Sequence, residues 1–415
     1  MKRSPLVVIF TTVFIDLLGF GIVIPVLPYY AEGTKFNGTP RTIGLLFASY
    51  SIMQLIFSPI LGRLSDRYGR RPILLLSLIG TGLGFLILGF ATTLWMLFAG
   101  RILDGITGGN ISTAQAYIAD ITKPEERAKG MGIVGAAFGL GFIFGPPIGG
   151  ILSRWGIAVP FLFAAAMAFG NAVLLYFTLP ETVTADHPAR ARTSESRWQL
   201  MRRSLKQSRL AFVLLIYFLF VVAFSIMTTT FALYTMYRFD YDAQHNGYLF
   251  LFTGVIAAVV QGTLIGKLAK RFGEIPLVIV GALLFTISLF IVPFVGPHAG
   301  GLAALLMITG TLAVGNSLAT PALTSLSSKS VGRSEQGSVL GVTQSAASLA
   351  RVVGPVLSAF LIYSATAPKH ISDTSIFATF WVGAAIMLIA FLAAVYFARS
   401  HASEYTETEI APVSS

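Results

Sequence analysis

Long apolar stretches alternate with short polar connections along almost the whole chain. About 20 helical residues, each rising about 1.5 Å, cross a bilayer core about 30 Å thick. The first stretch has this length, whereas the apolar core of a signal peptide has only about 7–15 residues. The pattern therefore predicts twelve transmembrane helices, at 6–30, 43–64, 73–92, 95–119, 130–153, 158–180, 210–237, 246–268, 276–296, 301–325, 337–363 and 375–398.

Composition agrees with this prediction. The 415 residues are 55% hydrophobic and 11% charged, whereas a soluble globular chain carries about 25% charged residues. We therefore expect an all-α, multi-pass membrane protein in contact with lipid. The absence of cysteine excludes disulfides and thiol chemistry. The five histidines fall in predicted loops or the tail without ligand-like neighbours, so we expect neither a metal site nor a cofactor.

The formal net charge of +11 comes from basic residues that are unevenly placed among the connections. With the N-terminus inside the cell, the predicted cytoplasmic segments hold 22 of the 29 Lys and Arg residues, and the external segments hold five. Cytoplasmic loops of membrane proteins carry such an excess. We therefore expect both termini to be cytoplasmic and the chain to lie in the bacterial cytoplasmic (inner) membrane. The charge then requires no nucleic-acid partner.

One long connection, 181–209, is polar and basic and divides the predicted spans six and six. It predicts an N-terminal six-helix bundle at 1–180, a cytoplasmic linker at 181–209, a C-terminal bundle at 210–398 and a cytoplasmic tail at 399–415. Within the linker, Trp198, Met201 and Leu205 have the spacing of a short helix on the membrane surface. A partly disordered tether is the alternative.

The two halves repeat each other, at an offset that changes little along the chain. Six helices per half preserve orientation, so the halves are parallel repeats, which place a substrate site near the midplane between them. We expect the two bundles to rock around this site as a monomer. The matches are 62–72 with 266–276 at an offset of 204, Gly109-Asn110 with Gly315-Asn316 at 206, and Glu126, Gly132, Gly145 and Pro146 with Glu335, Gly341, Gly354 and Pro355 at 209.

At these residues the chain resembles the Major Facilitator Superfamily. The segment Gly62-x3-Asp66-Arg67-x-Gly69-Arg70-Arg71 is similar to the loop signature of the family. The run Asp16 to Pro28 resembles the first helix of its drug/proton antiporters, and Arg101-x3-Gly105-x3-Gly109 resembles the fourth-helix motif of the family. Gly141, Gly145, Pro146, Gly149 and Gly150 resemble the antiporter motif of helix five. The resemblance covers the whole chain and implies the major facilitator fold, with twelve helices in two parallel six-helix bundles.

Four charged residues lie inside the predicted spans, namely Asp16, Arg101, Asp104 and Arg351. Charges in hydrocarbon are costly unless they are paired, and they mark functional sites. Helices one and four of the family face each other, so we expect Arg101 beside Asp16. Burial and a neighbouring arginine shift a carboxyl pKa in opposite directions. Asp16 is therefore predicted to carry protons, tuned by Arg101, or to form a static ion pair that fixes packing.

The other two charges each have two interpretations. Asp104 lies one helical turn from Arg101 and either neutralises it or carries protons itself. Arg351 lies just before Gly354-Pro355 and either attracts an anionic substrate group or holds a carbonyl at the proline break. Tetracycline antiporters carry an acidic residue in helix three where this chain has Gly84.

The loop 62–72 is predicted to act as a latch between the halves. Asp66 docks at the start of helix eleven in the outward-facing state, where the helix dipole is positive, and Arg70 pairs with Asp120, as the resemblance implies. In the alternative, Gly62 and Gly69 only form a tight turn, while Arg67, Arg70 and Arg71 set the topology.

Small residues in helix five, and polar residues elsewhere, complete the candidate site. The glycines of the helix-five motif allow close helix contact, and Pro146 permits a bend, which suits rocking as well as ordinary packing. Asn110, Asn316 and Gln344 lie on helices expected to line the cavity, so they are candidate substrate contacts together with Arg351.

These features favour proton-coupled efflux, by antiport, of small organic or drug-like molecules through alternating access, with the proton gradient as energy source. The alternative is uptake or facilitated diffusion of a nutrient such as a sugar or organic acid. We expect no enzyme, because no nucleophile–base, carboxylate–histidine or metal motif is present. The phosphate loop of an ATP-driven pump is also missing.

Overall fold

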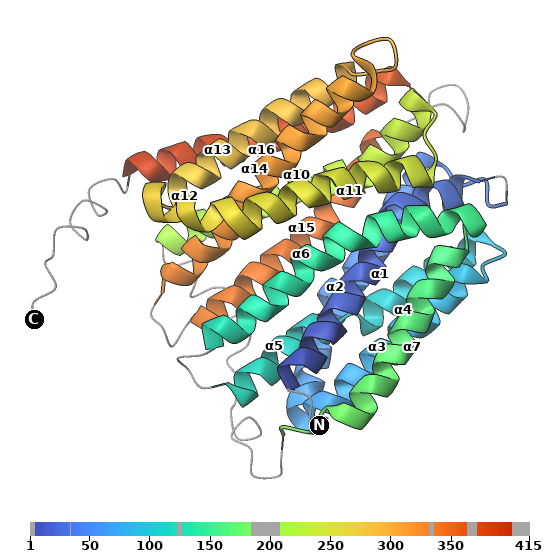
Figure 1. Cartoon of the computed structure of the whole chain (residues 1–415), viewed down its shortest axis with the longest axis vertical. Helices are drawn as coiled ribbons and strands as arrows, with labels where there is room; N and C mark the ends of the chain where they lie inside the picture. Colours follow the sequence, from blue (N-terminus) through green and yellow to red (C-terminus); the bar gives the residue numbers. More distant parts are fainter. Residues whose placement is uncertain are drawn as a thin grey trace, which may run out of the picture.

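The computed structural model describes residues 5–33, 35–122, 127–183, 208–331, 336–362 and 372–400. Within these ranges the regular structure is helical, without a strand. The expected all-α membrane fold is confirmed (Figure 1). The helices are α1 (Pro5–Glu32), α2 (Pro40–Tyr68), α3 (Arg70–Gly89), α4 (Leu94–Thr107), α5 (Asn110–Ile121), α6 (Arg127–Leu152), α7 (Val159–Thr178), α10 (Ser208–Phe239), α11 (Ala243–Val259), α12 (Ile265–Phe272), α13 (Glu274–Ile291), α14 (Gly301–Lys329), α15 (Gln336–Leu361) and α16 (Asp373–Ser400).

Eleven helical segments of the described ranges are long and apolar enough to cross a membrane. The exception is the fourth predicted span, 95–119, for which a single helix is wrong. It is divided into α4 and α5 at Gly108-Gly109. The N–H of Gly109 bonds to the carbonyl of Thr107 at 2.8 Å, which ends the regular helix. A Cβ atom on Gly109 would lie 2.6 Å from Leu61 of α2, so only glycine allows this approach.

The eighth predicted span, 246–268, is also longer and less regular than expected. It runs from Ala243 to Phe272 and contains a π-helical turn, Val260–Leu264, between α11 and α12. A π turn inserts an extra residue and turns the following side chains around the helix axis. Together, α4 with α5 and the eleven long segments account for the twelve expected crossings.

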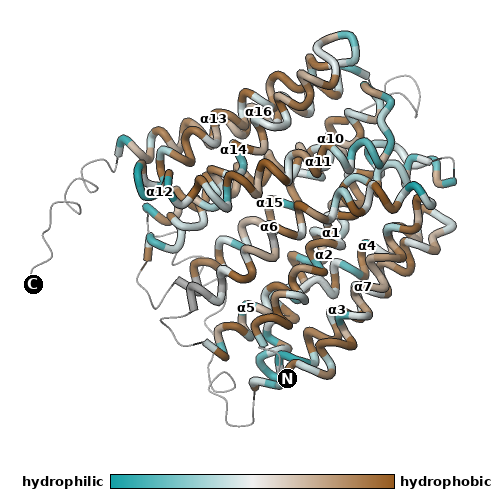
Figure 2. The backbone as a smooth tube through the Cα atoms, viewed as in Figure 1, coloured by the Kyte–Doolittle hydropathy of each residue, from teal (hydrophilic) through white to brown (hydrophobic). Residues whose placement is uncertain are grey.

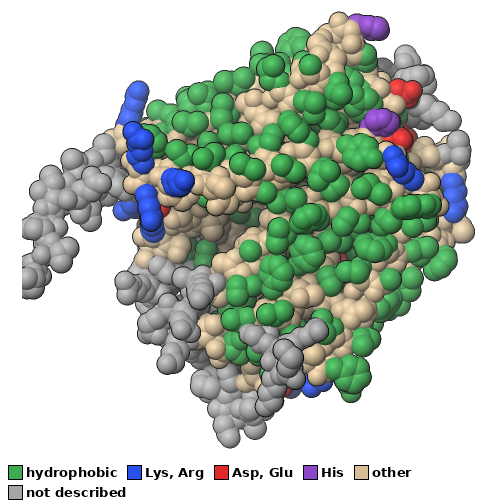
Figure 3. Space-filling model, viewed as in Figure 1, with side chains coloured by type: hydrophobic (Ala, Val, Ile, Leu, Met, Phe, Trp, Pro, Cys, Tyr) green, Lys and Arg blue, Asp and Glu red, His purple; other side chains and the backbone are tan. Residues whose placement is uncertain are grey.

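The outer surface of the described chain is apolar between its two ends. Large side chains such as Trp95, Phe177 and Met307 are more than 70% exposed. Hydrophobic residues run along the lengths of the helices, and hydrophilic ones gather near their ends (Figure 2). In the face shown in Figure 3, hydrophobic side chains cover the middle, and Lys and Arg lie toward the edges. Such a surface is unfavourable in water and suits lipid.

Two groups of helices, α1–α7 and α10–α16, each pack around apolar residues of their own. Phe85 and Phe161 are buried in the first group, and Phe220, Phe285 and Phe380 in the second. Most of the predicted linker, with Trp198, Met201 and Leu205, lies outside the described residues. The tail beyond Ser400 does so as well. The domain boundaries therefore stay a prediction.

The two groups meet at one end of the molecule, the closed end, which contains Glu32 and Tyr237. There the hydroxyl of Tyr237 donates to the carboxylate of Glu32, and the amide of Asn246 donates to the hydroxyl of Tyr29. At the opposite end, the open end, which contains the loop 62–72, the groups separate. A Cβ atom added to Gly135 of α6 or Gly341 of α15 would meet no described atom within 4 Å.

Candidate functional site

A cluster of charged side chains is buried inside the first group of helices. Arg101 of α4 is fully buried, and Asp16 of α1 and Asp104 of α4 are 7% and 5% exposed. The Nη1 atom of Arg101 lies 3.4 Å from the Oδ2 atom of Asp104, one helical turn away. The same guanidinium lies 4.3 Å from the centre of the Tyr50 ring, a favourable cation–π distance. Arg101 is therefore held by an acid and an aromatic face.

Asp16 is the carboxylate of this cluster that lacks an ion-pair partner within the described ranges. Its electrostatic neighbours are Asp104 and Asn110. The amide of Asn110 is adjacent to Asp16 and fully buried, yet it makes no hydrogen bond of good geometry to the described residues. Asp16 thus has one neighbouring acid and one neutral amide, rather than a cation, close by.

The backbone around this cluster is tightly packed, which fixes the positions of the charges. A Cβ atom on Gly84 of α3 would lie 2.9 Å from the carbonyl of Gly100 and 3.0 Å from the Cβ of Asp104. A larger side chain at position 84 would collide with α4. The glycine therefore brings α3 against α4, and the carboxylate at this point is supplied by Asp104.

The helix-five motif, which lies on α6, forms a close seam with α1. A Cβ atom on Gly145 would lie 2.7 Å from the Cα atom of Gly21, and one on Gly141 would lie 2.6 Å from the Cβ of Leu17. Further along, Gly149 packs on Ile22 in the same way. Leu17 directly follows Asp16, so the contact between α6 and α1 includes the backbone next to the buried acid. Motion of α6 along α1 would change the surroundings of Asp16.

The end of the same motif contacts the second group of helices. A Cβ atom on Gly150 would lie 2.9 Å from the Cα atom of Gly247 in α11. The Cδ atom of Pro146 lies against Gly21, and its carbonyl faces Gly247. One helix, α6, therefore packs closely on α1 and on α11, and it links the charge cluster to the contact between the halves.

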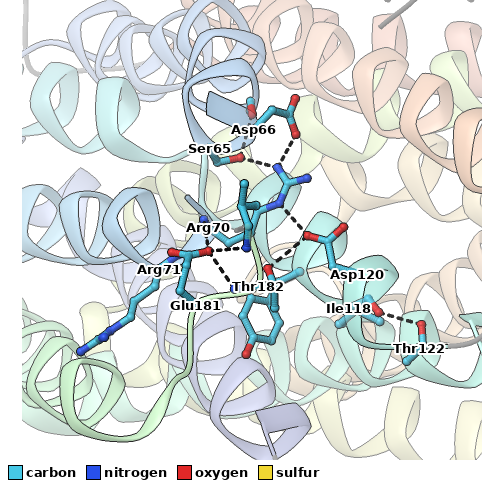
Figure 4. A network of polar contacts seen from close by, with 12 residues as sticks. Ser65, Asp66, Arg70, Arg71, Ile118, Asp120, Thr122, Glu181 and Thr182 are labelled. Atoms are coloured by element: carbon cyan, nitrogen blue, oxygen red, sulfur yellow. Dashed lines mark hydrogen bonds and ion pairs between the residues drawn. The ribbon is translucent and has the colours of Figure 1, made fainter. Parts of the chain in front are cut away.

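The loop 62–72 holds a network of ion pairs at the open end (Figure 4). The guanidinium of Arg70 is 2.5 Å from Asp66, 3.0 Å from Asp120 and 2.7 Å from the hydroxyl of Ser65. The expected pairing of Arg70 with Asp120 is thus present. Gly69, between α2 and α3, has φ of 111°, a conformation that favours glycine.

Glu181 is a further member of this network, and sequence reasoning missed it. Its carboxylate accepts hydrogen bonds from the N–H groups of Arg70 and Arg71 at 2.9 and 3.1 Å (Figure 4). These are the first two residues of α3, so a distant acid caps this helix and complements its dipole. Thr182 also donates to Asp120 at 3.2 Å. The start of the predicted linker is therefore tied to the loop.

A hollow lies between the two groups of helices. Its walls come from α2, α5 and α15, and they are mostly uncharged. Amide and hydroxyl groups alternate there with the apolar side chains of Leu55, Pro59 and Ile111. The polar lining residues are Gln54, Ser58, Ser112, Gln115, Gln344, Ser345 and Ser348.

The sequence profile of the Major Facilitator Superfamily matches residues 9–355 and, in an overlapping second match, 262–413. The chain belongs to the Major Facilitator Superfamily.

Relatives in this superfamily resemble the chain over most of its length. The class H tetracycline resistance protein of Pasteurella multocida is 36% identical and covers 88% of this chain and 90% of its own. Multidrug resistance protein 2 of Bacillus subtilis is 33% identical over 87% and 89%. The crystal structure of the human organic anion transporter MFSD10 (TETRAN) shares the fold, with a TM-score of 0.69, 24% identity, and coverage of 95% and 99%. The superfamily membership confirms a membrane transporter rather than an enzyme.

Within this superfamily fold, the predicted pairing of Asp16 with Arg101 is not what the described residues show. Arg101 forms its ion pair with Asp104, which lies on the same helix face and needs no second helix to reach it. The two residues still belong to one buried cluster, together with Asp104. The roles predicted for these three residues stay proposals.

The predicted cavity residues separate into two sets. Gln344 lines the hollow, and Arg351 donates to the lining residue Ser348 at 3.2 Å. The side chains of Asn110 and Asn316 are not part of the lining. Asn110 lies beside Asp16, because α5 restarts at this residue after the glycine break, and Asn316 accepts from Thr320 in its own helix.

Tyr50 is the other residue whose importance the sequence did not reveal. It interacts electrostatically with all four intramembrane charges, and its hydroxyl accepts from the amide of Gln54 at 2.9 Å. A tyrosine in an apolar run gives no sign of which charges surround it.

Proposed function

We propose that this superfamily member exports small organic or drug-like molecules in exchange for protons, by alternating access. The observation that carries the proposal is Asp16, a buried carboxylate without a cationic partner in the described chain, beside the α1–α6 seam. A carboxylate in hydrocarbon is costly, and binding a proton removes its charge. The names of the tetracycline and multidrug resistance relatives support small organic molecules as cargo.

Movement at the seam supplies a way to couple the proton to the cargo. Because Gly141 and Gly145 hold α6 against α1, rocking of the halves changes the packing on both sides of Asp16. The carboxyl then binds a proton in one state and releases it in the other. The Arg101–Asp104 pair stays neutral beside it. The proton gradient is the energy source, and no cofactor is needed.

The distribution of basic residues orients the proposed transporter. The loop 62–72 belongs to the segments that hold 22 of the 29 basic residues, so the open end faces the cytoplasm. The hollow is then accessible from inside, and the contacts of Glu32 and Tyr237 close the outside. We further propose a monomer in the bacterial inner membrane, with both termini cytoplasmic and bundles at 1–180 and 210–398.

The network around Arg70 acts in this scheme as the resting form of a latch. Asp66 bonds to Arg70 in the inward-open arrangement, with its side chain 39% exposed. In the outward-open state it docks at the start of α15, where the helix dipole attracts a carboxylate. The residues before Gln336 lie outside the described ranges, so this docking stays part of the proposal.

Everted membrane vesicles with an acidic lumen test proton coupling directly. A thermal-shift screen of the purified protein first selects compounds that bind. Adding a transported compound is then expected to release protons from the lumen, seen as recovery of a pH-sensitive dye. The Asp16→Asn variant should lose this recovery and still bind the compound. Wild-type transport without proton movement, or full coupling in Asp16→Asn, would overturn the proposal.

A further inference from the structure

Arg351 is a partly buried cation in the second group of helices, and the proposed proton chemistry does not use it. Within the described ranges, no carboxylate lies at ion-pair distance from it. Its hydrogen bond there goes to the hydroxyl of Ser348, at 3.2 Å, and its Nε atom is buried without a partner. A carbonyl at the Gly354-Pro355 break is therefore not its ligand. A charge inside a membrane span that no described acid compensates is costly, so it requires another explanation.

The position of Arg351 continues the lining of the hollow. Gly341, Gln344 and Ser348 of α15 line it, at intervals of three and four residues that mark one helix face. Arg351 is the next position on this face, one turn nearer the closed end. It therefore stands at the inner end of the hollow, behind Ser348.

The opposite wall ends in the same way. Gln54 and Ser58 of α2 line the hollow, and Tyr50 is the next position on their face. Tyr50 and Arg351 interact electrostatically, and so do Arg351 and Tyr217 of α10. The inner end of the hollow thus has Arg351 and the hydroxyl-bearing rings of two tyrosines, and no described carboxylate lies at ion-pair distance from Arg351.

The geometry points to Arg351 as the binding group for an anionic part of the cargo, a carboxylate or similar oxyanion on an apolar body. A guanidinium forms short, charge-assisted hydrogen bonds with a carboxylate, and this would satisfy its free N–H groups. The amides of Gln54 and Gln344 offer neutral hydrogen bonds, while Leu55, Pro59 and Ile111 offer apolar contact. This inference rests on the proposed function, because it names the chemical class of the exported molecule.

Calorimetric binding to the purified full chain at pH 7 tests the inference. The probes are benzoate, 2-naphthoate and biphenyl-4-carboxylate, each compared with its neutral carboxamide. We expect the best-fitting acid to bind at least about tenfold more tightly than its amide. Arg351→Gln should reduce this preference to about onefold, while Arg351→Lys, which keeps the charge, should retain part of it. Arg238→Gln, which removes a cation at the closed end, is the control and should leave the preference intact.

Two results would overturn the inference. In the first, no acid binds the wild type more tightly than its amide; in the second, the preference for the acid survives in Arg351→Gln. The wild-type comparison decides the matter even if Arg351→Gln fails to fold. Calorimetry needs no proton gradient, so either this test or the vesicle test can fail while the other succeeds. Acid binding without proton movement would overturn the export proposal alone. Proton-coupled export without any acid preference would overturn only the role of Arg351.

Discussion

The two repeated loops, 62–72 and 266–276, hold ion pairs at equivalent places with their charges exchanged. In the first loop, the cation Arg70 pairs with the anion Asp120. In the second, Glu274 stands 204 residues after Arg70 and pairs with Lys329, which stands 209 residues after Asp120. These are the offsets of the repeat itself. The repeat therefore preserves a contact between a loop and the end of a neighbouring helix, whichever partner carries the positive charge.

The same offsets relate the membrane-embedded parts of the two halves. Gly21 packs on Gly145 in the first half, and Ser225 packs on Gly354 in the second. The separations are again 204 and 209 residues. By this correspondence, the position of Asp16 is taken in the second half by Phe220, which is 1% exposed. Among the described residues, the halves share their helix packing, while the buried acids belong to the first half and the arginine without an ion pair belongs to the second.

The two loop pairs differ in how deeply their cations are buried, and this difference gives the largest expected effect, which is on the free energy of unfolding. Arg70 is 4% exposed and has three side-chain partners, whereas the side chain of Lys329 is 63% exposed. Arg70→Gln leaves Asp66 and Asp120 without a cation and should cost about 3 kcal/mol of unfolding free energy. Glu274→Gln should cost less than about 1 kcal/mol. Unfolding in mixed micelles measures both, and equal losses would contradict the difference in depth.

Tyr50 offers a second contrast, because the repeat has Gly254 in its place. Tyr50→Phe keeps the ring on Arg101 and removes the hydroxyl that accepts from Gln54. We expect proton-coupled transport to fall by about threefold to tenfold, the effect of one hydrogen bond. The control is Tyr396→Phe, which changes an exposed tyrosine in the second half and should leave proton movement unchanged. Equal losses in both variants would mean that the effect of Tyr50→Phe is not specific to the charge cluster.

Exchanging the charges of the second pair should have little effect. Glu274→Lys with Lys329→Glu rebuilds the pair in the sense of the first loop, and transport is expected within about twofold of wild type because one partner, Lys329, is 63% exposed. Glu274→Lys alone places like charges together and should be less stable. The exchange Arg70→Asp with Asp120→Arg should fail, since Asp66 and Ser65 also bind Arg70. If transport survived both exchanges, the burial of the pair would not determine whether its charges can be exchanged.

The sequence predicted the spans and the repeat well because both depend on local patterns. The lengths of the apolar stretches predicted the membrane crossings, and the motif around Arg70 predicted its pairing with Asp120. The break at Gly108-Gly109 escaped notice, and the close packing of Leu61 from α2 against Gly109 is a contact between helices that the local pattern does not contain. Hydropathy counts glycine as an ordinary member of an apolar stretch, so it gives no sign of such contacts.

Contacts between distant residues explain the other misses. Glu181 lies 111 residues after Arg70, and its position at the end of the first bundle resembled the start of a polar linker. One miss was local instead: Asp16 and Arg101 were expected together because helices one and four of the family face each other, whereas Arg101 pairs with Asp104 on its own helix. The lining by Gln54 and Gln344 depends on how α2 faces α15, a tertiary property that helical spacing does not contain.

The smallest expected effect concerns the starts of two equivalent helices. The cap of α2 is the neutral Thr39, whereas the cap of α11 is Asp242, which accepts from the N–H of His245 at 2.8 Å. Partial burial acts to raise the pKa of Asp242, but the hydrogen bonds from His245 outweigh it and hold this pKa below its usual value. A lowered pKa means that the carboxylate stabilises the folded state above about pH 4 and loses this contribution at lower pH.

Asp242→Asn keeps a capping oxygen and removes the charge, so it separates these two contributions. At pH 7 the variant should be less stable than wild type by about 0.5 kcal/mol, because an exposed charge at a helix start contributes only about this much to the free energy of unfolding. At pH 3 the difference should shrink as Asp242 is protonated. Thr39→Ser should show the same small change at both pH values. Thermal unfolding of both variants at both pH values measures these differences. An effect of Asp242→Asn that is independent of pH would mean that the charge of Asp242 does not contribute to the cap.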